Sequence, residues 1–287
     1  MNRLYILLIL LLAMLTMSFE SHSQDESPTF EGPYLGQKPP GLIPEVFAPG
    51  IVSKEHRDWT GSFTPDMKRY SFNRYNSDSE QTTTTVFKFE NNKWHESLAE
   101  PRVSGFVSPD GKTIHSGKRY RKRTYDGWSE LKSLGSPFKE IGIMTLTTSL
   151  KGTYVFDEWS TNGDGLLRYS RIVGGKREAP RPFSKEINTG TWTAHPFIAP
   201  DESYIIWDSE NEGGYGAVDL YISFKQHDGS WGPAINFGDK INTEGPDSGG
   251  YVSPDGKYFF FNRKISPEDS DVYWVDAQVI ENLRPKL

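Results

Sequence analysis

A short phrase recurs along this chain, and it constrains the fold more than any other feature. It reads Ser-Pro-Asp-Gly-Lys-Tyr at residues 253–258 and Ser-Pro-Asp-Gly-Lys at residues 108–112. Altered copies begin at Thr64, Ser149 and Ala199, and successive copies lie 41 to 54 residues apart. One four-stranded blade of a β-propeller needs about 40 to 50 residues. The sequence therefore predicts an all-β propeller in which each copy marks one blade.

The residues around each copy predict strands joined by a tight turn. In the last copy we expect a first strand at 251–253, a second at 258–261 and a third at 271–276. Within the turn, proline presets φ and glycine tolerates a positive φ. The aromatic content of 14%, with 27 glycines and 19 prolines, is typical of strands punctuated by turns. Glycine, proline and β-branched residues interrupt every candidate helix. Because the turn itself is repeated, its aspartates Asp110, Asp201 and Asp255 are interpreted as turn residues rather than catalysts.

The two ends of the propeller region predict how the ring closes. The last repeat ends without an outer strand, whereas residues 44–51 resemble an outer strand that has no blade before it. Pairing these two segments gives five four-stranded blades and leaves only short sheet edges. A six-bladed ring is the alternative, and it needs a repeat that the sequence does not show.

The chain divides into three parts. Residues 1–23 have an early arginine, an apolar run and then small residues, which is the pattern of a secretory signal peptide. An uncleaved anchor is the alternative for this segment. Residues 24–44 predict an extended polar leader, and residues 45–287 predict a single β-propeller domain. We therefore expect an exported protein, periplasmic or secreted, with no membrane span once the signal is cleaved.

Composition limits the partners. The chain has no cysteine, so its core must hold together without disulfides. The net charge of −6 is spread over mixed acidic and basic residues, which argues against nucleic-acid binding. We expect a monomer whose ligand is a protein, a peptide or a glycan.

Strand order predicts where a site would lie. In a four-stranded meander, the repeated turns share one face, and the irregular connections share the other, where function usually sits. Arginine clamps carboxylates, and tryptophan stacks on sugar rings or cations. The alternative is that these loops only pair charges with one another. The candidate ligand-binding residues on this irregular face are Arg57, Asp58, Trp59, Arg74, Arg119, Glu158, Trp159, His195, Asp208 and Arg263.

Chemical motifs are scarce. No HExxH motif or tight His/Asp cluster predicts a metal, and no Gly-x-Ser-x-Gly elbow predicts a serine nucleophile. The segment Gly163-Asp164-Gly165, with Asp157 and Asn162, is a weak calcium candidate, and we expect no other cofactor. Carboxylates could serve glycoside hydrolysis if suitably spaced. The candidates are Asp58, Glu158, Asp208 and Asp247, with His56 or His195 as proton carriers.

The repeated phrase, followed by an apolar strand and later by Asp-Leu-Tyr-Ile-Ser or Asp-Val-Tyr-Trp-Val-Asp, resembles the TolB-type, WD40-like β-propeller repeat. The resemblance covers about residues 45–280, and the style is similar to exported proteins of the Bacteroidetes group. It implies a propeller that acts as a binding or docking platform in the periplasm. It carries over no catalytic residue, because fold is not function.

Three hypotheses for function follow. The leading one is an exported, non-enzymatic binding or docking module whose ligand sits at the irregular loop face. The second is a carbohydrate-active hydrolase or lyase that uses carboxylates near the propeller axis. The third is a structural component of an envelope complex.

Overall fold

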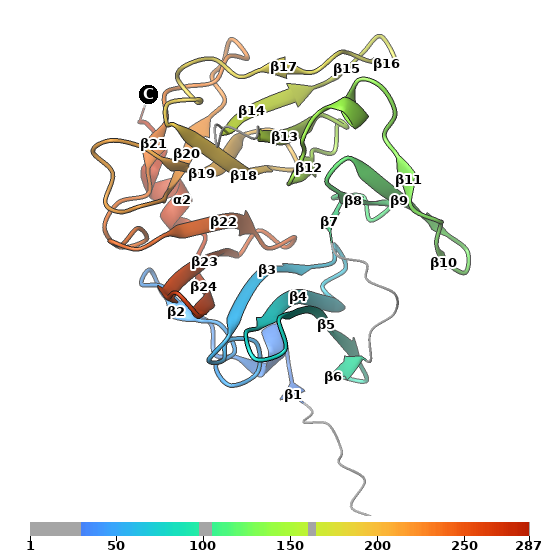
Figure 1. The fold of residues 1–287 in the computed structure, drawn as a ribbon, viewed down its shortest axis with the longest axis vertical. Helices are drawn as coiled ribbons and strands as arrows, with labels where there is room; N and C mark the ends of the chain where they lie inside the picture. Colours follow the sequence, from blue (N-terminus) through green and yellow to red (C-terminus); the bar gives the residue numbers. More distant parts are fainter. Residues whose placement is uncertain (1–29, 98–104, 160–164, 287) are drawn as a thin grey trace, which may run out of the picture.

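The computed structural model describes residues 30–97, 105–159 and 165–286 (Figure 1). The predicted signal peptide lies outside the described residues. Most of the regular structure is β-strand, accompanied by the helix α2 (Gln278–Leu283) and two 3-10 turns at Tyr34–Gly36 and Phe138–Glu140. None of the helices in the described ranges is long and apolar enough to cross a bilayer.

The strands form successive antiparallel meanders. The first contains β3 (Arg57–Phe63), β4 (Arg69–Asn76), β5 (Gln81–Glu90), β6 (Lys93–Ser97) and the added strand β1 (Phe30–Glu31). The next contains β7 (Phe106–Val107), β8 (Thr113–Ser116) and β9 (Arg119–Thr124), with β10 (Gly127–Trp128) and β11 (Lys132–Ser133) both paired to β9.

Two further meanders follow the same order. One contains β12 (Leu146–Thr148), β13 (Tyr154–Trp159), β14 (Gly165–Ser170) and β17 (Arg181–Pro182), beside the hairpin of β15 (Ile172–Val173) and β16 (Lys176–Arg177). The other contains β18 (Trp192–Ile198), β19 (Tyr204–Glu210), β20 (Asp219–Phe224) and β21 (Ile235–Asn236).

The last meander pairs its final strand with a segment from early in the chain. It contains β22 (Asp247–Val252), β23 (Tyr258–Ser266) and β24 (Asp269–Asp276), and β2 (Glu45–Val46) pairs antiparallel with β24. The register places Glu45 opposite Trp274 and Val46 opposite Tyr273. A single parallel pair between β24 and β3 links this meander to the first one.

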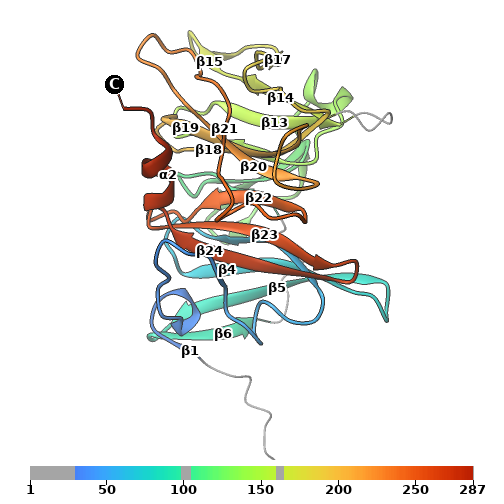
Figure 2. The ribbon, with the colours of Figure 1, turned by 90° about the vertical axis from the view of Figure 1, so that its left-hand side faces the viewer.

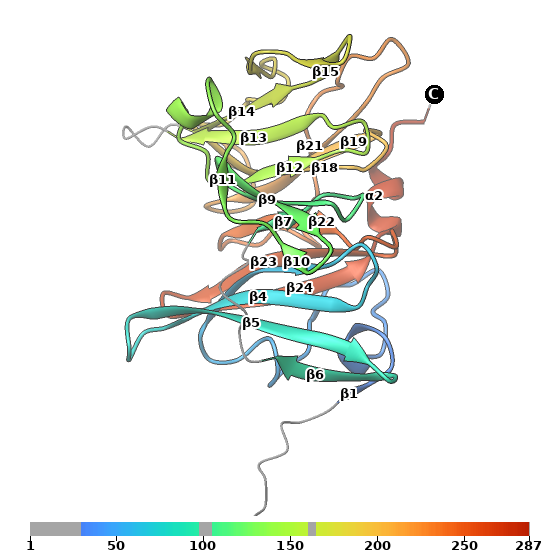
Figure 3. The same ribbon diagram turned by 90° about the vertical axis from the view of Figure 1, so that its right-hand side faces the viewer.

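The meanders surround a common centre (Figure 1), which is the arrangement of a β-propeller. Their first strands β3, β7, β12, β18 and β22 all contribute residues to one central cavity. In the side view of Figure 2 the sheets stack on one another, and α2 runs along one edge. Figure 3 shows the opposite side, where β7, β9 and β10 lie between β13 and β4.

The repeated phrase forms the same turn in all five copies. In each, a backbone N–H donates to the carbonyl three residues earlier, at 2.8 to 3.0 Å. The donor residue has a positive φ every time, which explains why glycine is frequent there. These residues are Met67, Gly111, Gly152, Glu202 and Gly256.

The turn aspartates have the structural role that the sequence predicts. Carboxylate oxygens of Asp110, Asp201 and Asp255 each accept a backbone N–H from two residues further along the chain. A short side chain that bonds to its own backbone in this way stabilises a turn locally. These three carboxylates therefore hold the turns.

The core lies between neighbouring sheets. One cluster packs aromatic residues of β3, β4, β23 and β24 around Phe47, which is completely buried. A second joins β18, β19 and β20 to β23 and reaches Ile280 of α2. Smaller clusters lie between β13 and β19 and around Phe156. Aromatic edge-to-face contacts such as Phe47–Phe260, at 5.1 Å, fill these layers without disulfides.

Two segments differ from the sequence-based expectation. Residues 30–36 belong to the segment predicted as leader, yet β1 pairs with β6, and Tyr34 and Leu35 are buried. Tyr34 packs on Phe63 and Trp274. The sequence did not predict this packing, because two isolated apolar residues in a stretch rich in proline and glycine show no periodic pattern. Helix α2 was also not expected, because six residues are too few to show a helical pattern.

Candidate functional site

A cavity of about 580 Å³ lies at the centre of the molecule. Its walls include the first strands and, at one end, residues 264–270 from the connection between β23 and β24. A separate apolar hollow of about 240 Å³ lies among the repeated turns. The second residue of every turn copy lines that hollow, namely Pro65, Pro109, Leu150, Pro200 and Pro254. The repeated turns therefore meet around the smaller hollow, whereas the irregular connections reach the central cavity.

Bulges in three first strands shape the cavity wall. The register shifts between Trp59 and Ser62 in β3, between Ala194 and Phe197 in β18, and between Ser248 and Tyr251 in β22. A bulge bends its strand and re-aims the side chains beside it. All three bulges border the cavity, so a common local irregularity turns polar groups toward the axis.

Glycine makes two of these bulges possible. A Cβ atom at Gly61 would meet the hydroxyl of Tyr70 at 1.9 Å, and one at Gly250 would meet the ring of Phe259 at 2.9 Å. Only a residue without a side chain lets the backbone pass so close to the second strand. In the third bulge His195 adopts a φ of 45°, an uncommon conformation for a non-glycine residue.

His195 is the centre of a charged network that joins three meanders. Its Nδ1 lies 2.9 Å from one carboxylate oxygen of Asp208, and its backbone N–H donates to Asp157 at 3.1 Å. The same Asp208 accepts the backbone N–H of Gly249 at 2.9 Å. Both carboxylates are 1% exposed, whereas the His195 side chain is 35% exposed and lines the cavity.

The carboxylates keep this imidazole charged. Burial lowers the pKa of His195, but the charge and hydrogen bond of Asp208 and the charge of Asp157 outweigh it and raise the pKa to about 9. Burial raises the pKa of Asp157 itself. At neutral pH, His195 is therefore a cation that can donate a hydrogen bond into the cavity.

Two arginine–aspartate clamps repeat the same geometry in different meanders. Arg74 binds Asp58, and Arg263 binds Asp247, each through Nε and a carboxylate oxygen at 2.7 Å. Both pairs are separated by 16 residues, and both arginines also donate to a backbone carbonyl. The two aspartates are fully buried. These four side chains thus tie loops to strands and leave no charge free for a ligand.

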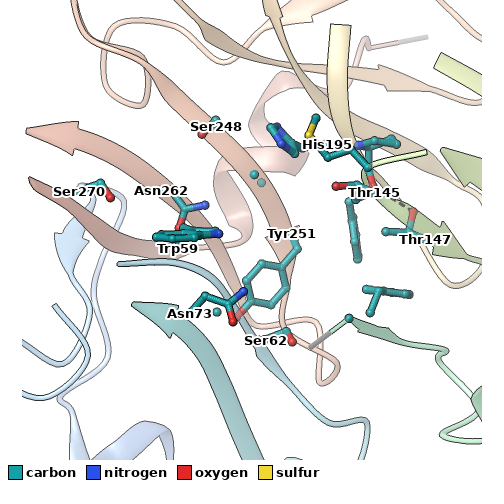
Figure 4. A pocket seen from close by; sticks show the side chains of 18 of the residues that line it. Trp59, Ser62, Asn73, Thr145, Thr147, His195, Ser248, Tyr251, Asn262 and Ser270 are labelled. Carbon is teal, nitrogen blue, oxygen red and sulfur yellow. Dashed lines mark hydrogen bonds between the residues drawn. The ribbon is translucent and has the colours of Figure 1, made fainter. Parts of the chain in front are cut away.

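The cavity wall is mostly apolar and carries a number of uncharged polar side chains. Figure 4 shows Trp59, Asn73 and Asn262 in one part of the view, with Thr145 and His195 across from them. The side-chain carbonyl oxygen of Asn73 accepts a hydrogen bond from the Thr84 hydroxyl at 2.8 Å, which orients its amide. An apolar wall with a few placed polar groups is typical of small-ligand sites.

Several buried polar atoms of the lining residues have no hydrogen-bond partner within the described chain. They are the hydroxyl of Tyr251, Nδ1 of His115, Oδ1 of Asp269 and Nε of Arg57. Burial, and then the charge of Arg177, lower the pKa of His115 to about 4, so its imidazole is neutral. These four atoms have almost no accessible surface, so they lie behind the wall and do not themselves reach a guest in the cavity.

The candidate residues from the sequence fall into two groups. Arg57, Trp59 and His195 line the cavity. Asp58, Arg74, Asp208 and Arg263 do not line it and are held in the pairs described above. Of the others, Glu158 pairs with Arg168 at 2.6 Å, Trp159 is 44% exposed, and Arg119 is exposed on β9.

The structure describes only part of the calcium candidate formed by Asp157 and residues 162–165. Residues 162–164 lie outside the described residues, and Asp157 uses its oxygens on the backbone N–H groups of Met144, Thr145 and His195. In the part of the chain that the structure describes, no group of three His, Asp or Glu side chains could hold a metal ion.

Sequence reasoning missed several lining residues, among them Asn73, His115, Tyr251 and Asn262. Asn73 and Asn262 directly precede Arg74 and Arg263, so the repeated Asn-Arg dipeptide was an available signal. The 16-residue spacing of the two clamps was another. Tyr251 and His115 had no comparable signal, because only the bulges and the packing of β8 bring them to the cavity.

No model of a protein family matches the sequence, and no curated protein matches it. Among solved structures, TolB from Acinetobacter baumannii is 12% identical with a TM-score of 0.44, over 76% of this chain and 54% of that one. The chain thus spans about half the length of that TolB. An endo-arabinase from Bacteroides thetaiotaomicron VPI-5482 is 12% identical with a TM-score of 0.44, over 82% and 96%. An oligogalacturonate lyase in complex with manganese is 15% identical with a TM-score of 0.40, over 80% and 64%.

Proposed function

We propose that this protein is an exported, non-enzymatic binding module of five blades, whose ring is closed by β2 and whose ligand occupies the central cavity. The pairing of β2 with β24 supports the closure, and the five converging turns support the blade number. The apolar N-terminal run of residues 4–17 supports export.

One observation carries the choice of binding over catalysis. Asp269 is the one acidic residue among the described residues that line the cavity, and four aspartates behind the wall are buried and already have partners: Asp58, Asp157, Asp208 and Asp247. Glycoside hydrolysis needs two carboxyl groups that both reach the bond to be cleaved. These four are instead engaged by arginine, histidine and backbone N–H groups, while the remaining wall offers amides, hydroxyls and an indole.

A hydrolase or lyase is the second candidate, and the dyad of His195 and Asp208 favours it. A histidine oriented by a carboxylate and exposed to a cavity is a common general acid or base. With a pKa of about 9, His195 is protonated at neutral pH and suits a proton donor better than a proton acceptor. In this mechanism His195 would donate to a leaving oxygen while Asp208 holds the ring.

A thermal-shift screen separates the two candidates. The purified protein is melted with a library of saccharides, sugar acids and short peptides, and each hit is titrated against Trp59→Ala and Trp128→Ala. Trp59 lines the cavity, whereas Trp128 packs on Arg123 at the tip of β10. We expect Trp59→Ala alone to lose binding, with the probe recovered intact by mass spectrometry. Conversion of the probe that stops in His195→Gln supports the enzyme instead, and binding that survives Trp59→Ala refutes the cavity as the site.

A further inference from the structure

We propose that the cavity selects an uncharged, polyhydroxylated ligand, a neutral sugar whose ring packs against Trp59. This inference rests on the proposed binding function and specifies the chemistry of its ligand. Three independent properties of the wall support it: its charge balance, its mixture of hydrogen-bond donors and acceptors, and its apolar surface.

The charge balance disfavours an ionic ligand. The cation of His195 faces two buried carboxylates, Asp157 and Asp208, so the network has no positive charge to spare. The other charged side chains of the lining are Arg57, which pairs with Glu268 at 3.5 Å, the exposed Lys264 and Asp269. Lys264 and Asp269 are opposite in sign, so the lining offers no cluster of like charges that would offset the lost hydration of an ionic ligand.

The hydrogen-bonding groups require a ligand that both donates and accepts. Asn73 and Asn262 present amides, each with an NH₂ donor and a carbonyl acceptor. The lining also carries hydroxyl groups, which can act in either sense, on Ser62, Thr145, Ser248 and Ser270 (Figure 4). A hydroxyl group is the common functional group that donates and accepts at once, and a sugar carries several of them around one ring.

The apolar part of the wall fits the face of such a ring. Trp59 stands on the bulge of β3, and Phe106, Phe197 and the backbone of Gly249–Gly250 complete the surface of the cavity. Tryptophan offers a large flat apolar face with a polar edge, suited to the C–H face of a sugar. The cavity of about 580 Å³ lies in the range of small-ligand sites.

Isothermal titration with matched probes tests this proposal. The neutral probes are galactobiose, cellobiose, xylobiose and mannobiose, and the charged and peptide probes are digalacturonic acid, chitosan disaccharide and trialanine. We expect at least one neutral disaccharide to bind and each charged probe to bind at least tenfold more weakly. Trp59→Ala and Asn262→Ala should each weaken the neutral ligand tenfold or more, Trp59→Phe should retain most of the affinity, and Trp128→Ala should change nothing.

The outcomes distinguish the two levels of the proposal. Binding of a charged probe or of trialanine in preference to every neutral sugar, still lost in Trp59→Ala, overturns the ligand class and leaves the binding function standing. Sugar binding that is unchanged in both Trp59→Ala and Asn262→Ala, in variants whose melting temperatures match the wild type, overturns the cavity as the site. No binding of any probe overturns both.

Discussion

Replacing Glu202 by glutamine should destabilise the protein in a pH-dependent manner. Glu202 occupies the turn position where three other copies have glycine, and its φ is 68°. Its side chain crosses to the preceding meander, where Ser149 and Thr153 donate to one oxygen at 2.8 and 2.7 Å. Lys225 donates to the other oxygen at 2.9 Å. Glutamine keeps the shape of the side chain, removes its charge and replaces one of the two acceptor oxygens by an NH₂ donor.

The pKa of Glu202 gives the magnitude. Burial raises it, but hydrogen bonds from Thr153, Lys225 and Ser149 outweigh burial and lower the pKa from 4.5 to about 2. Such a shift corresponds to about 3 kcal/mol of stability at neutral pH. Because the folded pKa is the lower one, the contribution is complete above pH 4.5 and is lost as the pH falls toward 2. At pH 3.5 about 2 kcal/mol should remain.

Urea unfolding at pH 7 and pH 3.5 measures this directly, and thermal melting should show a loss of roughly 6 to 12 °C at pH 7. Glu212→Gln is the matched control, because Glu212 is exposed in the loop between β19 and β20. We expect the control to match the wild type at both values of pH. A Glu202→Gln variant as stable as the wild type at pH 7, or a deficit that does not shrink in acid, would refute the reasoning.

Three further predictions concern the bulges and the buried charges. The imidazole of His195 should titrate near pH 9 by NMR. The stability that its protonation contributes should be complete below about pH 6.5 and should vanish as the pH rises through 9. A titration midpoint below pH 7 would contradict the network of His195 with Asp157 and Asp208. Gly250→Ala should lower the unfolding free energy by about 1 to 3 kcal/mol, because its Cβ would meet a phenylalanine ring at 2.9 Å. Gly41→Ala is the control and should be neutral, because the space around Gly41 is open. Equal melting temperatures for the two variants would count against the bulge argument. Arg263→Met should lower the unfolding free energy by about 3 to 5 kcal/mol, because it leaves Asp247 buried and unpaired. Adding Asp247→Asn should recover part of that stability. Loss of ligand binding without destabilisation would mean that this arginine binds the ligand instead.

The repeated phrase was a reliable guide to strands and turns. Its proline, aspartate and glycine act within four residues of one another, so their effect on the backbone is local and can be read from the sequence. Strand β23 begins at residue 258, where the pattern predicts a second strand, and β24 covers the third strand predicted at 271–276. Glu202 and Met67 depart from the glycine rule, and in both the turn keeps its positive φ.

The candidate site was predicted less completely, and the clamps explain why. A lone arginine in an irregular loop has the same sequence signature whether it binds a ligand or a buried aspartate. Arg74 and Arg263 turned out to be paired within the protein, each with an aspartate 16 residues away. Trp59 and His195 reach the cavity because bulges displace their strands, and a bulge depends on what the backbone packs against.

The sequence by itself determined the repeating strand–turn–strand units and the character of the two faces, because these follow from local backbone preferences and from strand order. Only the tertiary structure decided which side chains share the central cavity. That choice depends on long-range contacts, such as Asp157 accepting the backbone N–H of His195 and Asp208 accepting that of Gly249. Residues so far apart along the chain become neighbours only when the sheets close around one axis.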